Sequence, residues 1–199
     1  MSHALRIAVA DDEQDMRDFL ERMLSRCGHK VVSVAENGRQ LVEHCRALQP
    51  DLIITDIKMP ELDGIEASLQ LFHACPAAVI LVSAYHDADL IQHVESNHVM
   101  AYLVKPISQA DLEPTIAVAM QRFSEMQSLR KEAADLRQSL ADRKVIEQAK
   151  GILMNVAKVT EKDAFRRLQE LAADKNQKLV DAAHSVLALE KALRPANQV

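Results

Sequence analysis

The sequence predicts an α/β fold: a doubly wound, five-stranded parallel sheet over about the first 120 residues, followed by a coiled-coil helix and a small three-helix bundle. Two observations carry this prediction. In the first part, short and almost continuous apolar runs alternate with stretches of amphipathic helical spacing, which is typical of parallel strands covered on both faces. In the second part helix-favouring residues dominate, with neither Gly nor Pro between residues 116 and 142.

Composition excludes several protein classes. The chain has 199 residues, of which 48% are hydrophobic, so it can bury a core and is not predominantly disordered. No apolar run approaches the ~18 residues of a membrane span, and no signal-like segment precedes the first predicted strand. Three cysteines, Cys27, Cys45 and Cys75, show no metal-ligand spacing, and their odd number argues against a disulfide framework. We therefore expect a cytoplasmic protein with reduced thiols and no membrane partner.

Charge is divided unevenly along the chain. Residues 1–120 carry 9 Lys and Arg against 18 Asp and Glu, whereas residues 121–199 carry 15 against 11. The acidic half could hold a cation and the basic half could meet a polyanion. The alternative is that both are ordinary solvated surfaces.

The elements of the first part follow in order. The predicted strands are 5–10, 30–34, 52–55, 78–82 and 101–104. The predicted helices between them are 15–27, 38–48, 64–73 and 87–96, and a final helix begins near Gln109. In such a sheet, ligands bind outside the carboxyl ends of the strands.

Polar residues end four of these strands. Asp11 and Asp12 follow the first, Asp56 the third, Ser83 the fourth and Lys105 the fifth. Three converging carboxylates repel one another without a cation, and carboxylate oxygens are ligands that Mg²⁺ prefers. The lysine and the hydroxyl suit a phosphoryl group, and a carboxylate beside the metal can act as a nucleophile. Taken singly, each residue also has an ordinary role, such as an Asp N-cap or a Lys-Pro turn.

A continuous helix is expected to leave the first domain and link it to the tail, over residues 116–142. It carries a seam of alternating steps of three and four residues, typical of a coiled coil two heptads long. The seam residues are Met126, Leu129, Ala133, Leu136 and Leu140. Ile116, Met120 and Phe123 continue the seam upstream, with a stammer between Phe123 and Met126. Self-association and packing within the chain both remain open.

Three helical segments are expected in the tail: one from Arg143 to about Val156, a second opened by a capping box at Thr160–Asp163, and a third preceded by Asn176 or Gln177. The residues expected to face inward are Val145, Ile146, Ala149, Ile152, Leu153 and Val156 in the first; Ala164, Phe165, Leu168, Leu171 and Ala172 in the second; and Leu179, Ala183, Val186, Leu187 and Leu193 in the third.

Gly151 stands opposite the apolar face of its predicted helix, near Lys144 and Gln148. A mid-helix glycine costs about 1 kcal/mol relative to alanine, so this face could meet RNA or a partner helix, or the glycine is simply tolerated. Because Phe165 is the one aromatic after Phe123 and is expected to face inward, base stacking on a sheet of aromatics is excluded.

The tail also offers basic side chains for phosphate contacts. They are Arg143, Lys144, Lys150, Lys158, Arg166, Arg167, Lys175 and Lys178. Lys150 is the best single candidate for an RNA contact. The alternative is that Lys150 pairs within the bundle, for instance with Glu147 or Glu170.

The residues at the strand ends resemble the receiver domain of bacterial response regulators, with a flavodoxin-like fold, over residues 1–122. The resemblance is carried by Asp11-Asp12, by Asp56 with Lys58-Met59-Pro60 and Asp63-Gly64, by Ser83-Ala84, and by Tyr102 ahead of Lys105-Pro106. One departure is Asn97-His98-Val99-Met100, where receivers often have a Gly-Ala pair.

The resemblance implies a role for each matching residue. Asp56 is the expected phosphoacceptor, and Ser83 and Lys105 are expected to hold the phosphoryl oxygens. Asp11, Asp12, Asp56 and the backbone carbonyl of Lys58 are the implied Mg²⁺ ligands, and Tyr102 is the implied aromatic switch coupled to Ser83. A receiver catalyses only its own phosphotransfer and dephosphorylation, so we do not expect an enzyme in the wider sense.

The tail, residues 138–199, resembles the ANTAR domain, an RNA-binding output module of antitermination regulators. The run from Arg143 to Met154 carries this resemblance, with Ala164-Phe165, Leu168 and residues 179–183. The implied RNA-binding residues are Arg143, Lys144, Lys150, Gly151, Arg166, Arg167 and Lys178.

Together the two resemblances imply a two-component response regulator. A sensor histidine kinase would phosphorylate it, and it would form a homodimer on activation and bind RNA hairpins in nascent transcripts to promote antitermination. Two alternatives are a DNA-binding regulator that uses the tail as a helix-turn-helix, and a receiver with a protein-binding helical output.

Overall fold

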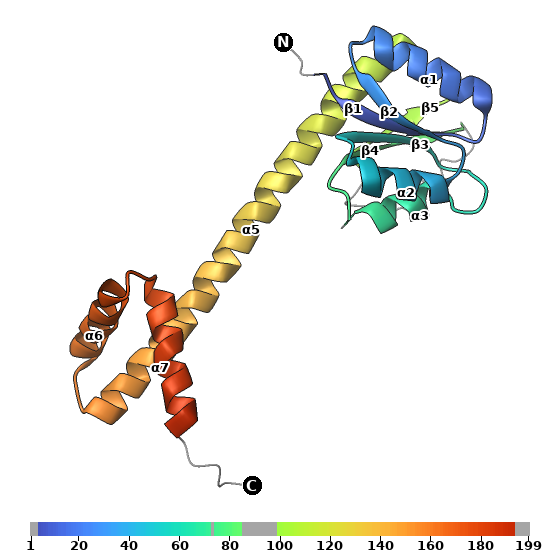
Figure 1. Ribbon diagram of the computed structural model, residues 1–199. Coiled ribbons are helices and arrows are strands. Elements are labelled where there is room, and N and C mark those ends of the chain that lie inside the picture. The colour runs from blue at the N-terminus through green and yellow to red at the C-terminus, as the bar shows by residue number, and fades with distance from the viewer. Residues whose placement is uncertain (1–3, 73, 85–98, 194–199) are drawn as a thin grey trace. The chain divides into compact units, whose positions relative to one another are not determined.

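A computed structural model of the chain describes residues 4–72, 74–84 and 99–193 (Figure 1). The chain divides after Gln127 into two compact units, which are described separately below. The helix predicted at 87–96 lies outside the described residues.

The first unit is built on a five-stranded parallel sheet with the strand order β2-β1-β3-β4-β5, which confirms the predicted fold. The strands are β1 Arg6–Ala10, β2 Lys30–Ala35, β3 Leu52–Asp56, β4 Ala78–Ser83 and β5 Ala101–Val104. The third and fourth strands are each one residue longer than predicted and end on Asp56 and Ser83. Asp56 and Ser83 are therefore held in the extended backbone of a strand and not in a loop.

Helices cover both faces of the sheet (Figure 1). On one face, α2 (Gly38–Leu48) and α3 (Gly64–Leu71) pack on Ala8, Ile53 and Leu81. On the other face, α1 (Gln14–Arg26) and the first turns of α5 (Gln109–Ala157) pack on alternate strand residues such as Ile7, Val9 and Ile54. Burial on both faces explains why the strand sequences are apolar almost throughout.

α5 is one helix from Gln109 to Ala157. The segment from Arg143 to Val156 is helical as expected, and it continues the linking helix without a break as the last part of α5. No Gly or Pro stands between residues 115 and 150 to end the helix, and apolar residues at both ends pack on a core. Within the described residues, no helix is both long enough and apolar enough to cross a membrane.

The second unit combines the end of α5 with α6 (Glu161–Asp174) and α7 (Leu179–Leu193). The Thr160 side chain caps α6 by accepting a hydrogen bond from the backbone N–H of Asp163. The centre of the core is formed by Ala149, Leu168, Ala183 and Val186, with partly buried aliphatic neighbours.

Among the residues whose burial the structure describes, which leaves out Leu193, three that were expected to face inward are exposed instead. Val156, Phe165 and Leu171 are 75%, 37% and 39% exposed. The buried stripe of α6 is narrow, since Ala164, Leu168 and Ala172 follow one another at intervals of four, and Phe165 and Leu171 flank it. Val156 lies in the last turn of α5, beyond the residues that pack in the core.

Candidate phosphoryl-transfer site and output surface

Three carboxylates gather at the carboxyl edge of the sheet. Asp11 follows β1 and is fully buried, Asp12 beside it is exposed, and Asp56 ends β3 with 7% of its surface exposed. One carboxylate oxygen from each lies within 4.8 Å of the others. The structure thus brings together the three acidic residues that the sequence placed at strand ends.

Lys105, directly after β5, supplies a positive charge to this cluster. Its Nζ lies 2.9 Å from Asp11 Oδ2 and 3.1 Å from Asp56 Oδ2. Burial by itself lowers the pKa of Lys105, but the carboxylates of Asp11 and Asp56 beside its ammonium outweigh it and raise the pKa. Burial raises the pKa of Asp56, and the hydrogen bond and charge of Lys105 offset this only in part. The cluster thus holds three carboxylates and the single ammonium of Lys105. Because negative charge is in excess, binding of a further cation is favourable.

Two buried polar atoms at this edge lack a hydrogen-bond partner among the described residues: Asp11 Oδ2 and Ser83 Oγ. The contact of Asp11 Oδ2 with Lys105 is an ion pair whose direction does not suit a hydrogen bond. A buried carboxylate oxygen without a donor fits a hard cation such as Mg²⁺. A buried hydroxyl without a partner fits a phosphoryl oxygen as its acceptor.

The loop after Asp56 is held closely against the end of β3. Gly64 donates a backbone hydrogen bond of 2.9 Å to the carbonyl of Ile57, and Asp63 caps α3 by accepting from Glu66 N–H. A Cβ at Gly64 would lie 1.9 Å from the Asp56 carbonyl oxygen, so no other residue fits there without a shift of the backbone. Lys58 lies in this loop with an exposed side chain, and the role of its carbonyl as a ligand stays a prediction.

Ser83 and Tyr102 lie on neighbouring strands. Ser83 pairs with Val104 in the register of β4 and β5, and its carbonyl accepts a 2.8 Å hydrogen bond from Lys105 N–H. Because Tyr102 stands two residues before Val104, the register gives it the same face of the sheet as Ser83. Tyr102 is partly buried against the core on the α2 and α3 side. Its coupling to Ser83 as a switch stays a prediction.

Arg17 belongs to the architecture of the site, although it was not among the residues predicted to act there. The residue is 8% exposed, and its Nη1 donates to the carbonyls of Asp11 at 2.7 Å and Asp12 at 2.9 Å. Its other terminal nitrogen donates to the side chain of Gln14. Arg17 therefore fixes the backbone that carries two of the carboxylates. The available signal is its helical register with Leu20 and Leu24, which places a charged residue on the buried face of α1.

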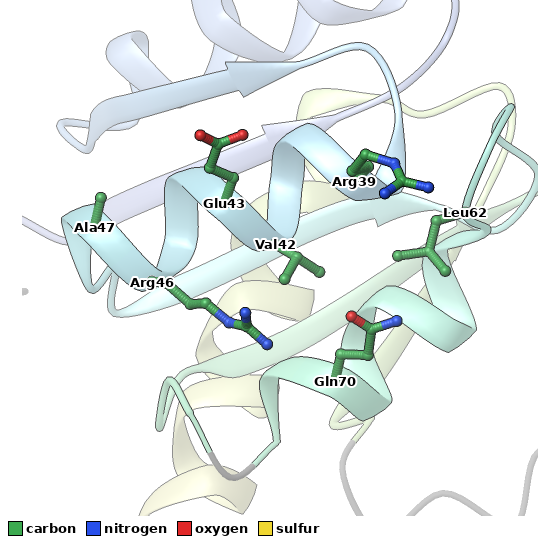
Figure 2. Close-up of a pocket in the computed structure, with 7 residues that line it drawn as sticks. All are labelled: Arg39, Val42, Glu43, Arg46, Ala47, Leu62 and Gln70. Carbon is green, nitrogen blue, oxygen red and sulfur yellow. The ribbon is translucent and has the colours of Figure 1, made fainter.

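A groove between α2 and α3 is separate from this site. Figure 2 shows Arg46 and Gln70 on facing helices, with Val42 on α2 between them and Leu62 near Arg39. Arg39 also forms a 3.1 Å ion pair with Glu61. None of the residues predicted to act at the carboxyl edge lines this groove.

Most of the basic residues predicted to contact RNA are on the surface of the second unit. Arg143, Lys144, Arg167 and Lys178 are exposed, as are Lys158 and Lys175. Arg166 is exposed but forms ion pairs with Asp163 at 3.2 Å and Glu170 at 3.8 Å. A Cβ at Gly151 would meet no atom within 4 Å, so no contact in the described structure requires glycine there.

Lys150 is placed differently from the prediction that it is the best RNA contact. It is 7% exposed, and its ammonium lies 2.6 Å from Glu161 and 2.9 Å from Glu147. This is the pairing role that the sequence left as the alternative, with Glu161 in place of Glu170. The sequence reading missed Glu161 because it opens α6, and only the packing of α6 on α5 brings it to Lys150.

The chain matches two families. The model of the response regulator receiver domain matches residues 7–117, and that of the ANTAR domain matches residues 134–187. The transcriptional regulatory protein PdtaR of Mycobacterium tuberculosis (strain ATCC 25618 / H37Rv) is 38% identical over 182 residues, 92% of this chain and 89% of PdtaR. The chemotaxis protein CheY of Thermotoga maritima is 33% identical over 102 residues, 51% of this chain and 85% of CheY.

Solved structures agree with the fold of the first unit. The signal receiver domain of a modulated diguanylate cyclase from Desulfovibrio desulfuricans G20 covers 62% of this chain and 99% of its own, with a TM-score of 0.58 and 24% identity. The fold, the acidic edge of the sheet and the two family matches lead to one conclusion. The chain belongs to the response regulators, with an N-terminal receiver domain and a C-terminal ANTAR domain as its RNA-binding output.

Proposed function

We propose that Asp56 accepts a phosphoryl group from a sensor histidine kinase and that the phosphorylated protein binds RNA hairpins in nascent transcripts to promote transcription antitermination. The observation that supports the first part best is the acidic edge itself, with Lys105 between Asp11 and Asp56 and a buried Ser83 hydroxyl without a partner. The ANTAR match and the exposed basic residues of the second unit support the second part.

The phosphotransfer step uses residues of this chain in distinct roles. A carboxylate oxygen of Asp56 attacks the phosphorus of the kinase phosphohistidine, a P–O bond forms, and the P–N bond breaks as the imidazole leaves with its electron pair. The Lys105 ammonium and the Ser83 hydroxyl hold the transferred oxygens by charge-assisted hydrogen bonds. Asp11, Asp12, Asp56 and the Lys58 carbonyl would hold Mg²⁺, which neutralises negative charge when bound.

The output step uses the basic surface of the second unit. Exposed Arg143, Lys144, Arg167 and Lys178 can each approach an RNA phosphate, whereas Lys150 is held inside by two carboxylates. Activation is proposed to make the protein a homodimer. The name of PdtaR describes that relative as a transcriptional regulatory protein, which agrees with an output directed at gene expression.

Acetyl phosphate and Mg²⁺ provide the first test, because a small phosphodonor replaces the unidentified kinase. We expect the parent protein to be labelled and Asp56→Asn to stay unlabelled, since an amide is not a nucleophile. Partly buried Asp63, whose carboxylate caps α3, supplies the matched control Asp63→Asn. If Asp56→Asn is still phosphorylated by acetyl phosphate, another residue is the phosphoacceptor.

RNA binding is tested separately, with an RNA hairpin library and duplex DNA of equal length as competitor. The phosphorylated protein should bind hairpins more tightly than the unphosphorylated protein and more tightly than it binds the DNA. Removing Arg143 and Lys178 together should weaken hairpin binding and flatten its salt dependence, by roughly 0.7 in the log–log slope per lost contact to single-stranded phosphate. Preference for duplex DNA would favour a DNA-binding output instead.

A further inference from the structure

The middle of α5 carries large apolar side chains that no part of the described structure covers. Leu129, Leu136 and Leu140 are 66%, 62% and 61% exposed, and Ala133 between them is exposed as well. Single exposed leucines are ordinary on protein surfaces. Three on one stripe of one helix, at coiled-coil spacing, indicate a partner surface.

On either side of this stripe, the apolar residues of α5 pack on the core of one of the two domains. Phe123 and Met126 pack on the receiver core, and Val145 and Ile146 pack on the core of the output domain. Packing within the chain therefore accounts for the apolar residues before and after the stripe, but not for those within it.

The steps between the stripe residues define the heptad. Steps of three, four, three and four place Met126, Ala133 and Leu140 at a positions and Leu129 and Leu136 at d positions. The flanking positions are then Glu125 and Glu132 at g, and Arg130 and Arg137 at e. Two of the three g residues along the stripe are acidic, the third being Ser139, and both e residues are basic.

We infer that two copies of this chain pair through α5 in parallel and in register, and that Glu125 of each copy faces Arg130 of the other while Glu132 faces Arg137. In a parallel pair, each g residue meets the e residue of the following heptad on the other helix. Both contacts of this kind are then attractive. In an antiparallel pair e meets e and g meets g, so that arginine faces arginine and glutamate faces glutamate. The e and g charges are known determinants of orientation in coiled coils.

Glu132 and Arg137 have no competing partner on their own helix. Neither has an oppositely charged residue three or four positions away, the spacing at which helix neighbours interact. Neither makes an ion pair or a side-chain hydrogen bond within the described residues. Five positions separate them, so they do not face each other in one helix, and a second helix is needed to bring them together.

This inference deepens the proposed homodimer and rests on it, by assigning its surface, orientation and register. Disulfide trapping tests the geometry on the full-length protein in a Cys27→Ser background, since Cys45 and Cys75 are buried. Ala133→Cys and Leu140→Cys, made separately, should each give a covalent dimer on mild oxidation after treatment with acetyl phosphate and Mg²⁺. Lys131→Cys, on the opposite side of the helix, is the matched control and should not. In an antiparallel pair, only a residue at the centre of the contact lies next to the same residue of the other copy. At most one of the two cysteine variants would then form the covalent dimer.

Charge reversal tests the register. Glu132→Arg alone and Arg137→Glu alone should each raise the dimer Kd roughly tenfold or more, because each reversal places two pairs of like charges in contact. The double variant should return the Kd to near the parent value. Light scattering over a wide concentration range measures all four proteins.

Each failure has its own meaning. A parent protein that stays monomeric both with and without phosphorylation overturns the homodimer and this inference with it. A parent that dimerises while trapping at neither or only one of the two a positions leaves the homodimer standing and overturns this surface or its parallel register. Trapping at both positions without rescue in the double charge variant overturns the Glu132–Arg137 pairing.

Discussion

The ammonium of Lys150 lies 2.6 Å from the carboxylate of Glu161, the first residue of α6, and 2.9 Å from Glu147 on its own helix. The ring of Phe165 lies on another side, with its centroid 5.9 Å from the same ammonium. One lysine thus joins the last turns of α5 to the first turns of α6, at the point where the chain reverses direction between the two helices.

Replacing Lys150 by alanine should destabilise the output domain, because two carboxylates lose their shared cation and Phe165 loses its covering side chain. We expect a lower melting temperature for Lys150→Ala, measured by circular dichroism on the full-length protein. Exposed Lys144 supplies the control, since Lys144→Ala should melt with the parent. If Lys150→Ala also melts with the parent but binds RNA more weakly, Lys150 is a contact residue after all.

The same pair predicts a dependence of stability on pH. The hydrogen bond and charge of Lys150 lower the pKa of Glu161 from its ordinary value of 4.5. A group whose pKa is lower in the folded state contributes stability above its unfolded pKa, and that stability is lost as the pH falls through the folded pKa. Urea unfolding at pH 7 and below pH 4.5 should show a smaller loss on acidification for Glu161→Gln than for the parent. An equal loss in both proteins would mean that Glu161 is not the group that titrates.

Removing two of the three carboxylates should separate metal binding from folding. Asp11→Asn with Asp12→Asn should bind Mg²⁺ much more weakly, since two anionic ligands become neutral. Without metal, the variant should be at least as stable as the parent because like charges at the edge no longer repel. Calorimetric titration with Mg²⁺ and thermal unfolding in a chelator measure the two effects. Parent-like Mg²⁺ affinity would contradict the ligand assignment.

Arg17→Met should destabilise the receiver by roughly 1.5–3 kcal/mol, the range for hydrogen bonds from a charged group, because the carbonyls of Asp11 and Asp12 lose their donor. Arg17→Lys should recover part of the loss by keeping one donor and the charge. Guanidinium unfolding checks both variants. A loss below about 0.5 kcal/mol in Arg17→Met, the size of an ordinary surface change, would show that the loop holds its shape without Arg17.

The acidic edge was accessible from the sequence because parallel strands end at one edge. Once Asp11, Asp56 and Lys105 are assigned to strand ends, the topology brings them together whatever the details of the packing. The leucine stripe of α5 was accessible for a similar reason, since helical spacing alone defines it. In both cases the regular geometry of a strand or helix determines where a residue lies in space from its position in the sequence.

Arg17 and Lys150 could not be assigned in this way. The partners of Arg17 are backbone carbonyls, which leave no trace in the sequence. The partner of Lys150 across the turn is set by the angle at which α6 packs on α5, and that angle depends on many side chains together. Phe165 was expected inside because it is large and apolar, but the buried stripe of α6 is Ala164, Leu168 and Ala172, and Phe165 lies beside it.

The close approach of Gly64 to Asp56 has a consequence for how variants of this protein are interpreted. A Cβ at residue 64 would lie 1.9 Å from the Asp56 carbonyl oxygen, and one at Gly38 would lie 2.2 Å from the carbonyl oxygen of Leu62 in the same loop. In a deep mutational scan that selects for signalling, both glycines should tolerate substitution as poorly as the acceptor aspartate does. Sensitivity to mutation would then assign Gly38 and Gly64 to the catalytic centre, although their contribution is only the absence of a side chain where the backbone approaches closely.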